Sequence, residues 1–177
     1  MKQQPKYNKK LFLVGMMGTG KSTVGKLIAK KINLQFLDTD LWIEKKNDSS
    51  VENIFQNHGE SHFRHLEKNL VECQLPEEPC VVSCGGGLCI ADGMMEVLKC
   101  KGIVVCLWAT PKEIAGRLAS NNERPLLKGA NLQSKISEIL EKRRVKYLSA
   151  DHVIKTDGLP TNQVAEQVIE LLDSSVD

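Results

Sequence analysis

The sequence predicts an α/β fold in three layers, in which a five-stranded parallel sheet lies between two layers of helices. Strand-like and helix-like runs alternate along the 177 residues, which is typical of parallel sheets whose strands are joined by helices. Four of the five strand-like runs are largely apolar, as strands covered on both faces require. A glycine-rich loop follows the first strand, and ligands of such sheets bind at the carboxyl ends of strands.

Each element has its own run in the sequence. The expected strands are Lys10–Val14, Leu34–Leu37, Cys80–Cys84, Ile103–Trp108 and His152–Lys155. The expected helices are Lys21–Ile32, Leu41–Lys46, Val51–Gln56, Glu60–Leu75, Asp92–Lys99, Lys112–Ala119, Leu132–Leu148 and Asn162–Leu172. We expect residues 1–177 to form a single domain. Residues 120–133 have little periodicity, and we interpret them either as a surface loop or as a mobile lid that closes over a nucleotide and carries Arg124.

The bulk composition is that of a soluble globular protein, with 41% hydrophobic and 26% charged residues. The net charge of +2 is too small to indicate a nucleic-acid or membrane partner. No apolar run approaches the roughly 18 residues of a membrane span, so we expect a cytoplasmic protein. A longer precursor with a removed targeting peptide is the alternative. We also expect the protein to be a monomer. The six cysteines form no C-x-x-C pair, and we expect buried, reduced thiols.

The loop after the first strand has the pattern G-x-x-x-x-G-K-S, from Gly15 to Ser22. A strand before it and a helix after it are the context in which this pattern binds phosphate, so we expect a P-loop nucleotide-binding fold. Its backbone N–H groups and the helix N-terminus would hold phosphate oxygens. Lys21 would reach the β- and γ-phosphates of ATP, and the Ser22 hydroxyl would bind Mg²⁺. The predicted nucleotide-binding residues are Gly15, Gly18, Thr19, Gly20, Lys21, Ser22 and Thr23.

Two carboxylates follow the second strand, at Asp38 and Asp40. If the chain stays extended there, residues two apart point the same way, so one carboxylate can face the metal and the other the acceptor. We expect Asp38 to hold Mg²⁺ through water, because Mg²⁺ gives up its water reluctantly. Asp40 would accept the proton of an attacking hydroxyl. An aspartate here can equally cap the following helix, and both roles can hold together.

Three further patterns in the sequence each allow a structural and a functional interpretation. Arg64 and Glu67 are three apart on one helix face, where a solvated ion pair is the ordinary explanation and a fork held for a carboxylate substrate is the other. The run Gly85–Gly87 ends a strand, and it is either a flexible turn or backbone that approaches a ligand. Histidines 58, 62 and 65 share a helix face that could bind a metal, which we discount because Mg²⁺ prefers oxygen.

The ordered motifs of the chain resemble those of the shikimate kinase family. The matching segments are GMMGTGKST at 15–23, FLDTD at 36–40, VENIFQNHGESHFRHLE at 51–67, VVSCGGG at 81–87, ERPLL at 123–127 and KRRVKY at 142–147. The resemblance extends from about Leu11 to Leu172, and it implies transfer of the γ-phosphoryl group of ATP to the 3-hydroxyl of shikimate.

The resemblance also implies roles for single residues. Lys21 and Ser22 match the ATP- and Mg²⁺-binding pair, Asp38 the acid near the metal, and Asp40 the acid that binds the reacting hydroxyl. The remaining matches are Arg64 and Arg143 for the substrate carboxylate, Gly85, Gly86 and Gly87 for the shikimate hydroxyls, Phe55 and Phe63 for an apolar wall, Glu67 for orienting Arg64, Arg124 for the lid and Arg117 for the adenine.

Two departures from the family pattern remove no charge that the phosphoryl transfer needs. Val145-Lys146 replaces a Pro-Leu pair, and the segment 157–161 replaces an Asn-Pro pair near the adenine. Two alternatives to shikimate phosphorylation remain from the sequence. One is a related kinase for gluconate or a nucleoside monophosphate, and the other is a non-catalytic relative that binds nucleotide as a regulator.

Overall fold

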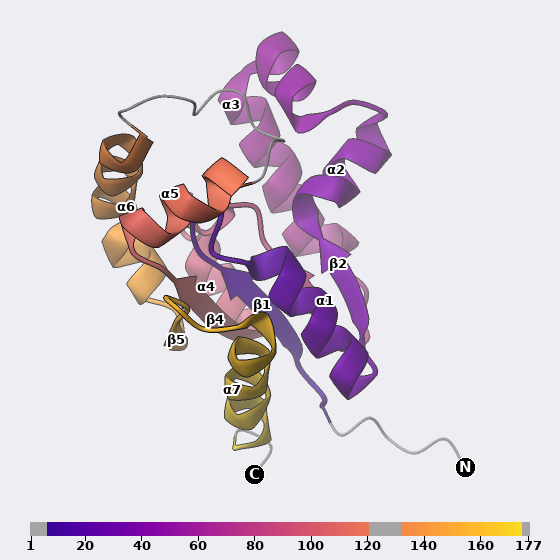
Figure 1. The fold of residues 1–177 in the computed structure, drawn as a ribbon. Coiled ribbons are helices and arrows are strands. Elements are labelled where there is room, and N and C mark those ends of the chain that lie inside the picture. The colour runs from indigo at the N-terminus through magenta and orange to yellow at the C-terminus, as the bar shows by residue number, and fades with distance from the viewer. Residues whose placement is uncertain (1–6, 121–131, 175–177) are drawn as a thin grey trace.

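The computed structural model describes residues 7–120 and 132–174. These form a five-stranded, fully parallel sheet with the strand order β2-β3-β1-β4-β5, and helices cover both of its faces (Figure 1). The strands are β1 (Lys10–Val14), β2 (Gln35–Asp38), β3 (Cys80–Ser83), β4 (Gly102–Trp108) and β5 (His152–Lys155). The helices are α1 (Lys21–Ile32), α2 (Thr39–Asn47), α3 (Val51–Asn69), α4 (Met94–Lys101), α5 (Pro111–Ser120), α6 (Leu132–Leu148) and α7 (Thr161–Asp173), with a π-helical turn at Leu70–Gln74 and a 3-10 turn at Leu88–Ile90.

The side chains of the central strand β1 alternate between two cores. Leu11 and Leu13 pack in one core with residues of α1 and α7, and Phe12 and Val14 pack in the other with residues of α4 and α6. All four side chains are at most 1% exposed. Strand residues apolar on both faces are therefore the basis of the three-layer architecture, as the sequence predicted.

The predicted and observed elements differ mainly at their ends. The two helices expected at 51–56 and 60–75 are present as two helical segments of α3, separated by a kink at Gly59, where φ is 79° and ψ is 172°. The second segment was predicted too long, because α3 ends at Asn69 and a π-helical turn follows. The helix expected from Asp92 begins at Met94, because Gly93 caps it with a left-handed backbone.

The cysteine prediction is partly wrong. All six thiols are free, but Cys73 and Cys100 are exposed and only the other four are buried. Among the helices in the described ranges, none is both long and apolar enough to cross a bilayer.

Candidate active site

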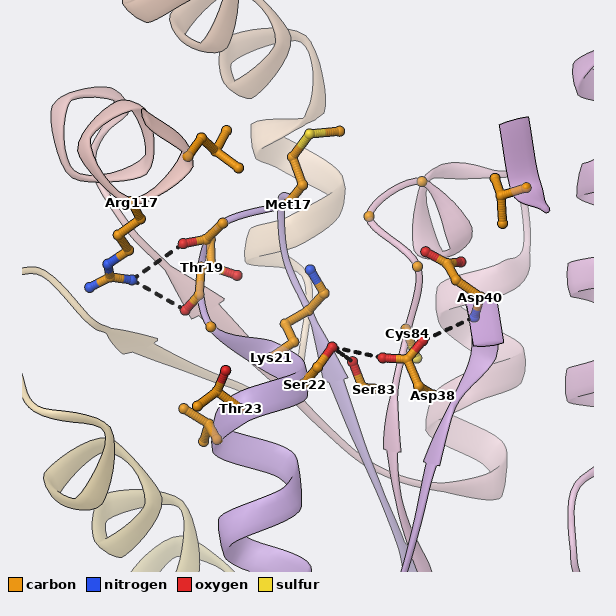
Figure 2. A pocket seen from close by; sticks show the side chains of 18 of the residues that line it. Met17, Thr19, Lys21, Ser22, Thr23, Asp38, Asp40, Ser83, Cys84 and Arg117 are labelled. Atoms are coloured by element: carbon orange, nitrogen blue, oxygen red, sulfur yellow. Dashed lines mark hydrogen bonds between the residues drawn. The ribbon is translucent and has the colours of Figure 1, made fainter. Parts of the chain in front are cut away.

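The phosphate-binding loop lies between β1 and α1, as its sequence pattern predicted (Figure 2). The Lys21 ammonium donates hydrogen bonds of 2.9 Å to the carbonyl oxygens of Gly15 and Met16, so the side chain folds back over its own loop. Gly20 caps α1 in a left-handed conformation, with φ at 95°, and no side chain caps the first N–H groups. Uncapped N–H groups at a helix N-terminus form a ready anion site, so the loop suits a phosphate chain.

Lys21 is the charged group deepest in this loop, with 8% of its surface exposed. Burial lowers its pKa, and the strongest opposing influence is the carboxylate of Asp40. The neighbouring thiols of Cys84 and Cys89 stay protonated, because burial raises their pKa, to about 11 for Cys89. The Asp40 carboxylate is therefore the main negative charge near Lys21, and a bound phosphate would add to it.

The two proposed Mg²⁺ ligands meet beside the loop. Ser22 Oγ donates to Asp38 Oδ2 at 2.7 Å and lies 3.1 Å from Ser83 Oγ at the end of β3 (Figure 2). A hydroxyl and a carboxylate oxygen next to a phosphate loop form the donor set that Mg²⁺ prefers, so these residues fit the ion. Ser83 was not identified from the sequence, since an isolated serine in an apolar strand carries no signal of its own.

The premise that the chain stays extended after Asp38 was wrong. Asp38 ends β2 and caps α2, because its Oδ1 accepts hydrogen bonds from the backbone N–H groups of Asp40 and Leu41. Asp40 consequently lies in the first turn of α2 rather than in a strand. The capping alternative is correct, and the two carboxylates are related by a helix start instead of by strand alternation.

Gly85 brings Asp40 and Glu67 to one point of the cavity wall. Its N–H donates to Thr39 Oγ1 at 2.8 Å, which anchors the glycine run to the start of α2. A Cβ atom placed on Gly85 would lie 3.0 Å from Glu67 Oε1 and closer still to Asp40 Oδ1. Glycine is thus needed here for room, which favours the ligand-approach interpretation over a flexible turn.

Arg64 lies on α3 between two carboxylates. Its Nη1 donates to Glu67 Oε2 at 2.6 Å, and its Nε and Nη2 donate to Glu60 Oε1 at 3.2 and 2.9 Å. The guanidinium carbon is 5.9 and 5.7 Å from the ring centroids of Phe55 and Phe63, which are themselves 4.8 Å apart. An apolar wall and a fixed guanidinium therefore share one side of the cavity, an arrangement suited to a ring that bears a carboxylate.

Glu67 is a buried acid with only one of its two carboxylate oxygens hydrogen-bonded within residues 7–120 and 132–174. Only 2% of its surface is exposed, and Oε1 has no partner in those ranges. Burial raises the pKa of Glu67 to about 7, even though Arg64 acts in the opposite direction. Burial also acts to lower the pKa of Arg64, but the hydrogen bonds that Arg64 donates to Glu67 and Glu60, together with the charges of these acids, outweigh it and raise that pKa.

The glycine run is also held from α6. The Tyr147 hydroxyl donates to the Gly86 carbonyl oxygen at 2.5 Å, and Arg143 Nη1 lies 3.4 Å from the same oxygen. On its other side, a Cβ atom on Gly86 would come within 3.2 Å of the Met17 backbone nitrogen in the phosphate loop. Gly86 thus connects the phosphate loop to the helix that carries Arg143. Tyr147 was missed in the sequence, where it looks like an ordinary core aromatic residue.

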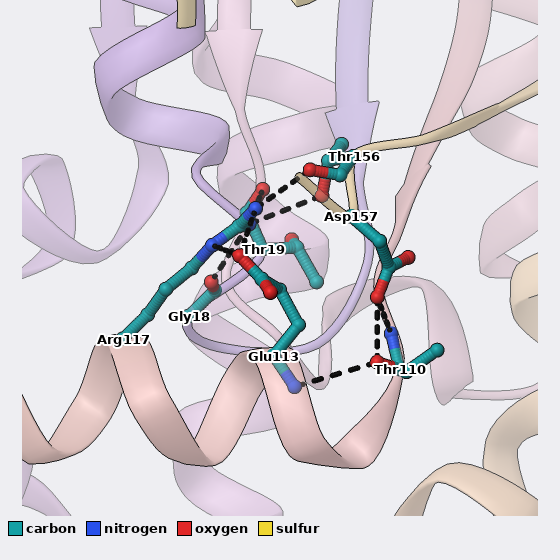
Figure 3. A network of polar contacts seen from close by, with 7 residues as sticks. All are labelled: Gly18, Thr19, Thr110, Glu113, Arg117, Thr156 and Asp157. Carbon is teal, nitrogen blue, oxygen red and sulfur yellow. Dashed lines mark hydrogen bonds and ion pairs between the residues drawn. The ribbon is translucent and has the colours of Figure 1, made fainter. Parts of the chain in front are cut away.

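Arg117 links the phosphate loop to the segment after β5 (Figure 3). Its Nη2 donates to the Thr156 carbonyl at 2.7 Å, and its Nη1 lies 3.4 Å from the Thr19 carbonyl. Asp157 accepts hydrogen bonds from both the backbone N–H and the hydroxyl of Thr110, which joins the same segment to the start of α5. The region where the sequence placed the adenine is therefore fixed to the phosphate loop through side chains of α5 and its start.

Nearly all predicted site residues line a single cavity of about 830 Å³. They are Gly18, Thr19, Gly20, Lys21, Ser22, Thr23, Asp38, Asp40, Phe55, Phe63, Arg64, Glu67, Gly85, Gly86, Gly87, Arg117 and Arg143. Gly15 shapes the loop from behind the cavity, where a Cβ atom would collide with the Leu107 carbonyl of β4. Arg124 lies outside the described residues, as does most of the expected lid; Ser120 ends α5, and Leu132 and Gln133 begin α6.

The histidine face of α3 does not form a metal site by itself. The His58 and His62 rings are 5.0 Å apart. Within residues 7–120 and 132–174, no group of three or more His, Cys, Asp or Glu side chains is arranged to hold a metal ion.

Comparison with known proteins agrees with this geometry. The family model described as shikimate kinase matches residues 17–173. The chain belongs to the shikimate kinase family. It is similar to the shikimate kinase of Thermodesulfovibrio yellowstonii, with 41% identity over 162 residues that cover 92% of this chain and 94% of that relative. The shikimate kinase of Persephonella marina is 40% identical, over 90% of this chain and 96% of that one.

Solved structures extend the family match to the fold. The structure of shikimate kinase from Acinetobacter baumannii in complex with shikimate superposes with a TM-score of 0.85 at 32% identity, over 95% of this chain and 94% of that one. The three-layer α/β/α prediction of the P-loop type is therefore confirmed. A gluconokinase from Sinorhizobium meliloti has a TM-score of 0.69 at 20% identity, which indicates a shared fold and nothing about its substrate.

Proposed function

We propose that this protein transfers the γ-phosphoryl group of ATP to the 3-hydroxyl of shikimate. The observation that carries the proposal is the single cavity, which the phosphate loop, the acids Asp38 and Asp40, and the arginines Arg64 and Arg143 line together. Phosphoryl transfer leaves little covalent work to the protein, so catalysis consists of alignment and neutralisation of charge. Membership of the shikimate kinase family and the likeness to a shikimate-bound relative support this acceptor.

In the proposed reaction, the phosphate loop and Lys21 bind the ATP phosphates. Ser22 and Asp38 would hold Mg²⁺, directly or through water, and the ion would neutralise charge on the phosphate oxygens. Asp40 orients the acceptor hydroxyl and takes its proton as the oxygen attacks phosphorus. The Lys21 ammonium then faces negative charge from both the nucleotide and the acid, which suits a role in the transition state.

The substrate carboxylate would bind at the other end of the cavity. Arg64 and Arg143 would share it, the ring would lie against Phe55 and Phe63, and Glu67 would hold the Arg64 fork in its plane. The backbone at 85–87 would contact the hydroxyls, because it lines the cavity directly beside Asp40 and Arg64. Arg117, which lines the cavity next to Thr156, would lie beside the adenine.

We further propose that the chain works as a single kinase domain and a monomer, since one chain supplies the phosphate loop, Asp40, Arg64 and Arg143 that the reaction needs. Six unpaired thiols fit a reducing compartment such as the cytoplasm. Light scattering of the purified protein with and without both substrates tests the monomer.

ADP release measured by a coupled assay tests the reaction. We expect turnover that requires both shikimate and Mg²⁺, so removal of shikimate or addition of excess EDTA should each stop it. Gluconate and nucleoside monophosphates serve as competing acceptors in the same assay. A faster rate with one of these acceptors would replace the shikimate assignment, and ATP binding without turnover on any acceptor would indicate a regulator.

A further inference from the structure

Glu60 holds a part of Arg64 that the proposed function assigns to the substrate. Its Oε1 accepts from both Nε and Nη2, the side-on pair of donors that carboxylates commonly use on arginine. Glu60 also lines the cavity together with Arg64 and Arg143. The carboxylate of Glu60 is therefore of the same chemical kind, and on the same guanidinium, as the group that the substrate would present.

The two acids on Arg64 differ in how firmly they are held. Glu67 is 2% exposed and pairs at 2.6 Å, whereas the Glu60 side chain is 65% exposed and pairs at 2.9 Å. A buried acid cannot leave its partner without losing all compensation, but an exposed acid regains water when it lets go. Glu67 is thus a fixed partner of Arg64, and Glu60 is a weak one.

The carboxylates of Glu60 and Glu67 compete with an incoming anion for the guanidinium of Arg64. Both acids accept hydrogen bonds from the guanidinium, Glu67 from Nη1 and Glu60 from Nε and Nη2, and Asp40 adds a negative charge near Glu67. A substrate carboxylate that approaches Arg64 would therefore meet occupied donors and a like charge. Release of Glu60 frees Nε and Nη2 and removes one negative charge from beside Arg64 when the substrate arrives.

Glu60 comes directly after a bend in α3. Gly59 interrupts α3 with φ at 79° and ψ at 172°, and a Cβ atom there would meet nothing within 4 Å. Glycine at 59 therefore serves the backbone conformation and not a lack of space. Glu60 is the first residue after this break, so its charge lies at the start of a new helical segment, where a negative side chain is favoured.

We propose that Glu60 is an internal competitor, which neutralises Arg64 before the substrate binds and yields it to the substrate carboxylate. This inference rests on the proposed function, because it takes the ligand of Arg64 to be a carboxylate. It makes Glu60 a specificity residue: an acidic ligand can replace the lost pairing, whereas a neutral ligand would leave Glu60 in place.

The test compares Glu60→Gln and Glu60→Ala with the wild-type chain, using titration calorimetry with shikimate and with its uncharged methyl ester. Exposed ion pairs are weak, so we expect shikimate to bind about two- to fivefold more tightly to both variants. Binding of the methyl ester should not change. Glu52→Gln is the matched control, because it removes the same charge from an exposed acid on the same helix, whose side chain accepts a hydrogen bond from Gln56.

Each outcome decides the inference. Tighter shikimate binding in both Glu60 variants, but not in the Glu52 variant or with the ester, supports it. Unchanged or weaker shikimate binding in the Glu60 variants would refute the inference, because it would show that Glu60 stays on Arg64 and helps to hold it. An equal gain in affinity in the Glu52 variant would also refute it, because the gain would then come from the lower negative charge of the whole protein. Failure of the wild-type chain to bind shikimate at all would refute the proposed function separately.

Discussion

Replacement of Gly87 by alanine is expected to weaken shikimate binding while leaving the nucleotide site intact. Gly87 has φ at −105° and ψ at −8°, which alanine adopts without strain, so the variant should fold. Its new Cβ atom would lie 2.7 Å from Cζ and Nη1 of Arg64 and closer still to Nη2. Normal contacts are about 3.5 Å or more, so the guanidinium must retreat by about 1 Å.

The size of the effect follows from the bond that this retreat disturbs. A hydrogen bond between charged groups contributes about 1.5–3 kcal/mol, so loss of the aligned contact from Arg64 to the substrate carboxylate should weaken shikimate binding about 10- to 150-fold. The ATP affinity should stay the same, because Arg64 lies on the acceptor side of the cavity.

Calorimetry with shikimate and, separately, with a non-hydrolysable ATP analogue measures both affinities. Gly116→Ala is the matched control, since a Cβ atom there meets nothing within 4 Å on the exposed face of α5. The reasoning fails if shikimate affinity stays within about twofold of the wild-type value, or if the ATP analogue loses as much affinity as shikimate.

Three further predictions address Asp40, Tyr147 and Glu67. Asp40→Asn should lower kcat by about 10²- to 10⁴-fold with ATP binding retained, because the proton acceptor is lost; near-normal turnover would rule out that role. Tyr147→Phe should lower the free energy of unfolding by about 1–2 kcal/mol in urea titrations, since the buried Gly86 carbonyl loses its 2.5 Å partner; an unchanged midpoint would contradict this. The Glu67 pKa of about 7 lies above its unfolded value near 4.5, so the contribution of Glu67 to stability is fully present below about pH 4.5 and declines up to about pH 7. The wild-type chain should therefore lose stability relative to Glu67→Gln between pH 5 and pH 8, and an equal difference at both pH values would refute the assignment.

Local patterns were enough to predict the elements and the nucleotide end of the site. β1, β5, α1 and α6 have the bounds that the sequence predicted, since apolar runs and helical periodicity are properties of neighbouring residues. The phosphate loop was equally readable, because its glycines, lysine and serine act within one turn of chain. The expectation of an extended chain after Asp38 was wrong, because the Asp38 side chain caps α2 at that point.

The acceptor end depended on tertiary structure. The spacing of Arg64 and Glu67 fits a surface ion pair as well as a buried one, and only the packing of α3 against the cavity shows that Glu67 is buried and Glu60 is exposed. Ser83 reaches Ser22 across 61 residues of sequence, and Tyr147 reaches Gly86 across the same separation. The sequence by itself determined which charges the chain carries, and it predicted a phosphate-binding loop after β1. Only the tertiary structure decided which acid can leave Arg64. The reason is that the exposure of Glu60 and the burial of Glu67 arise when segments distant in the chain pack together.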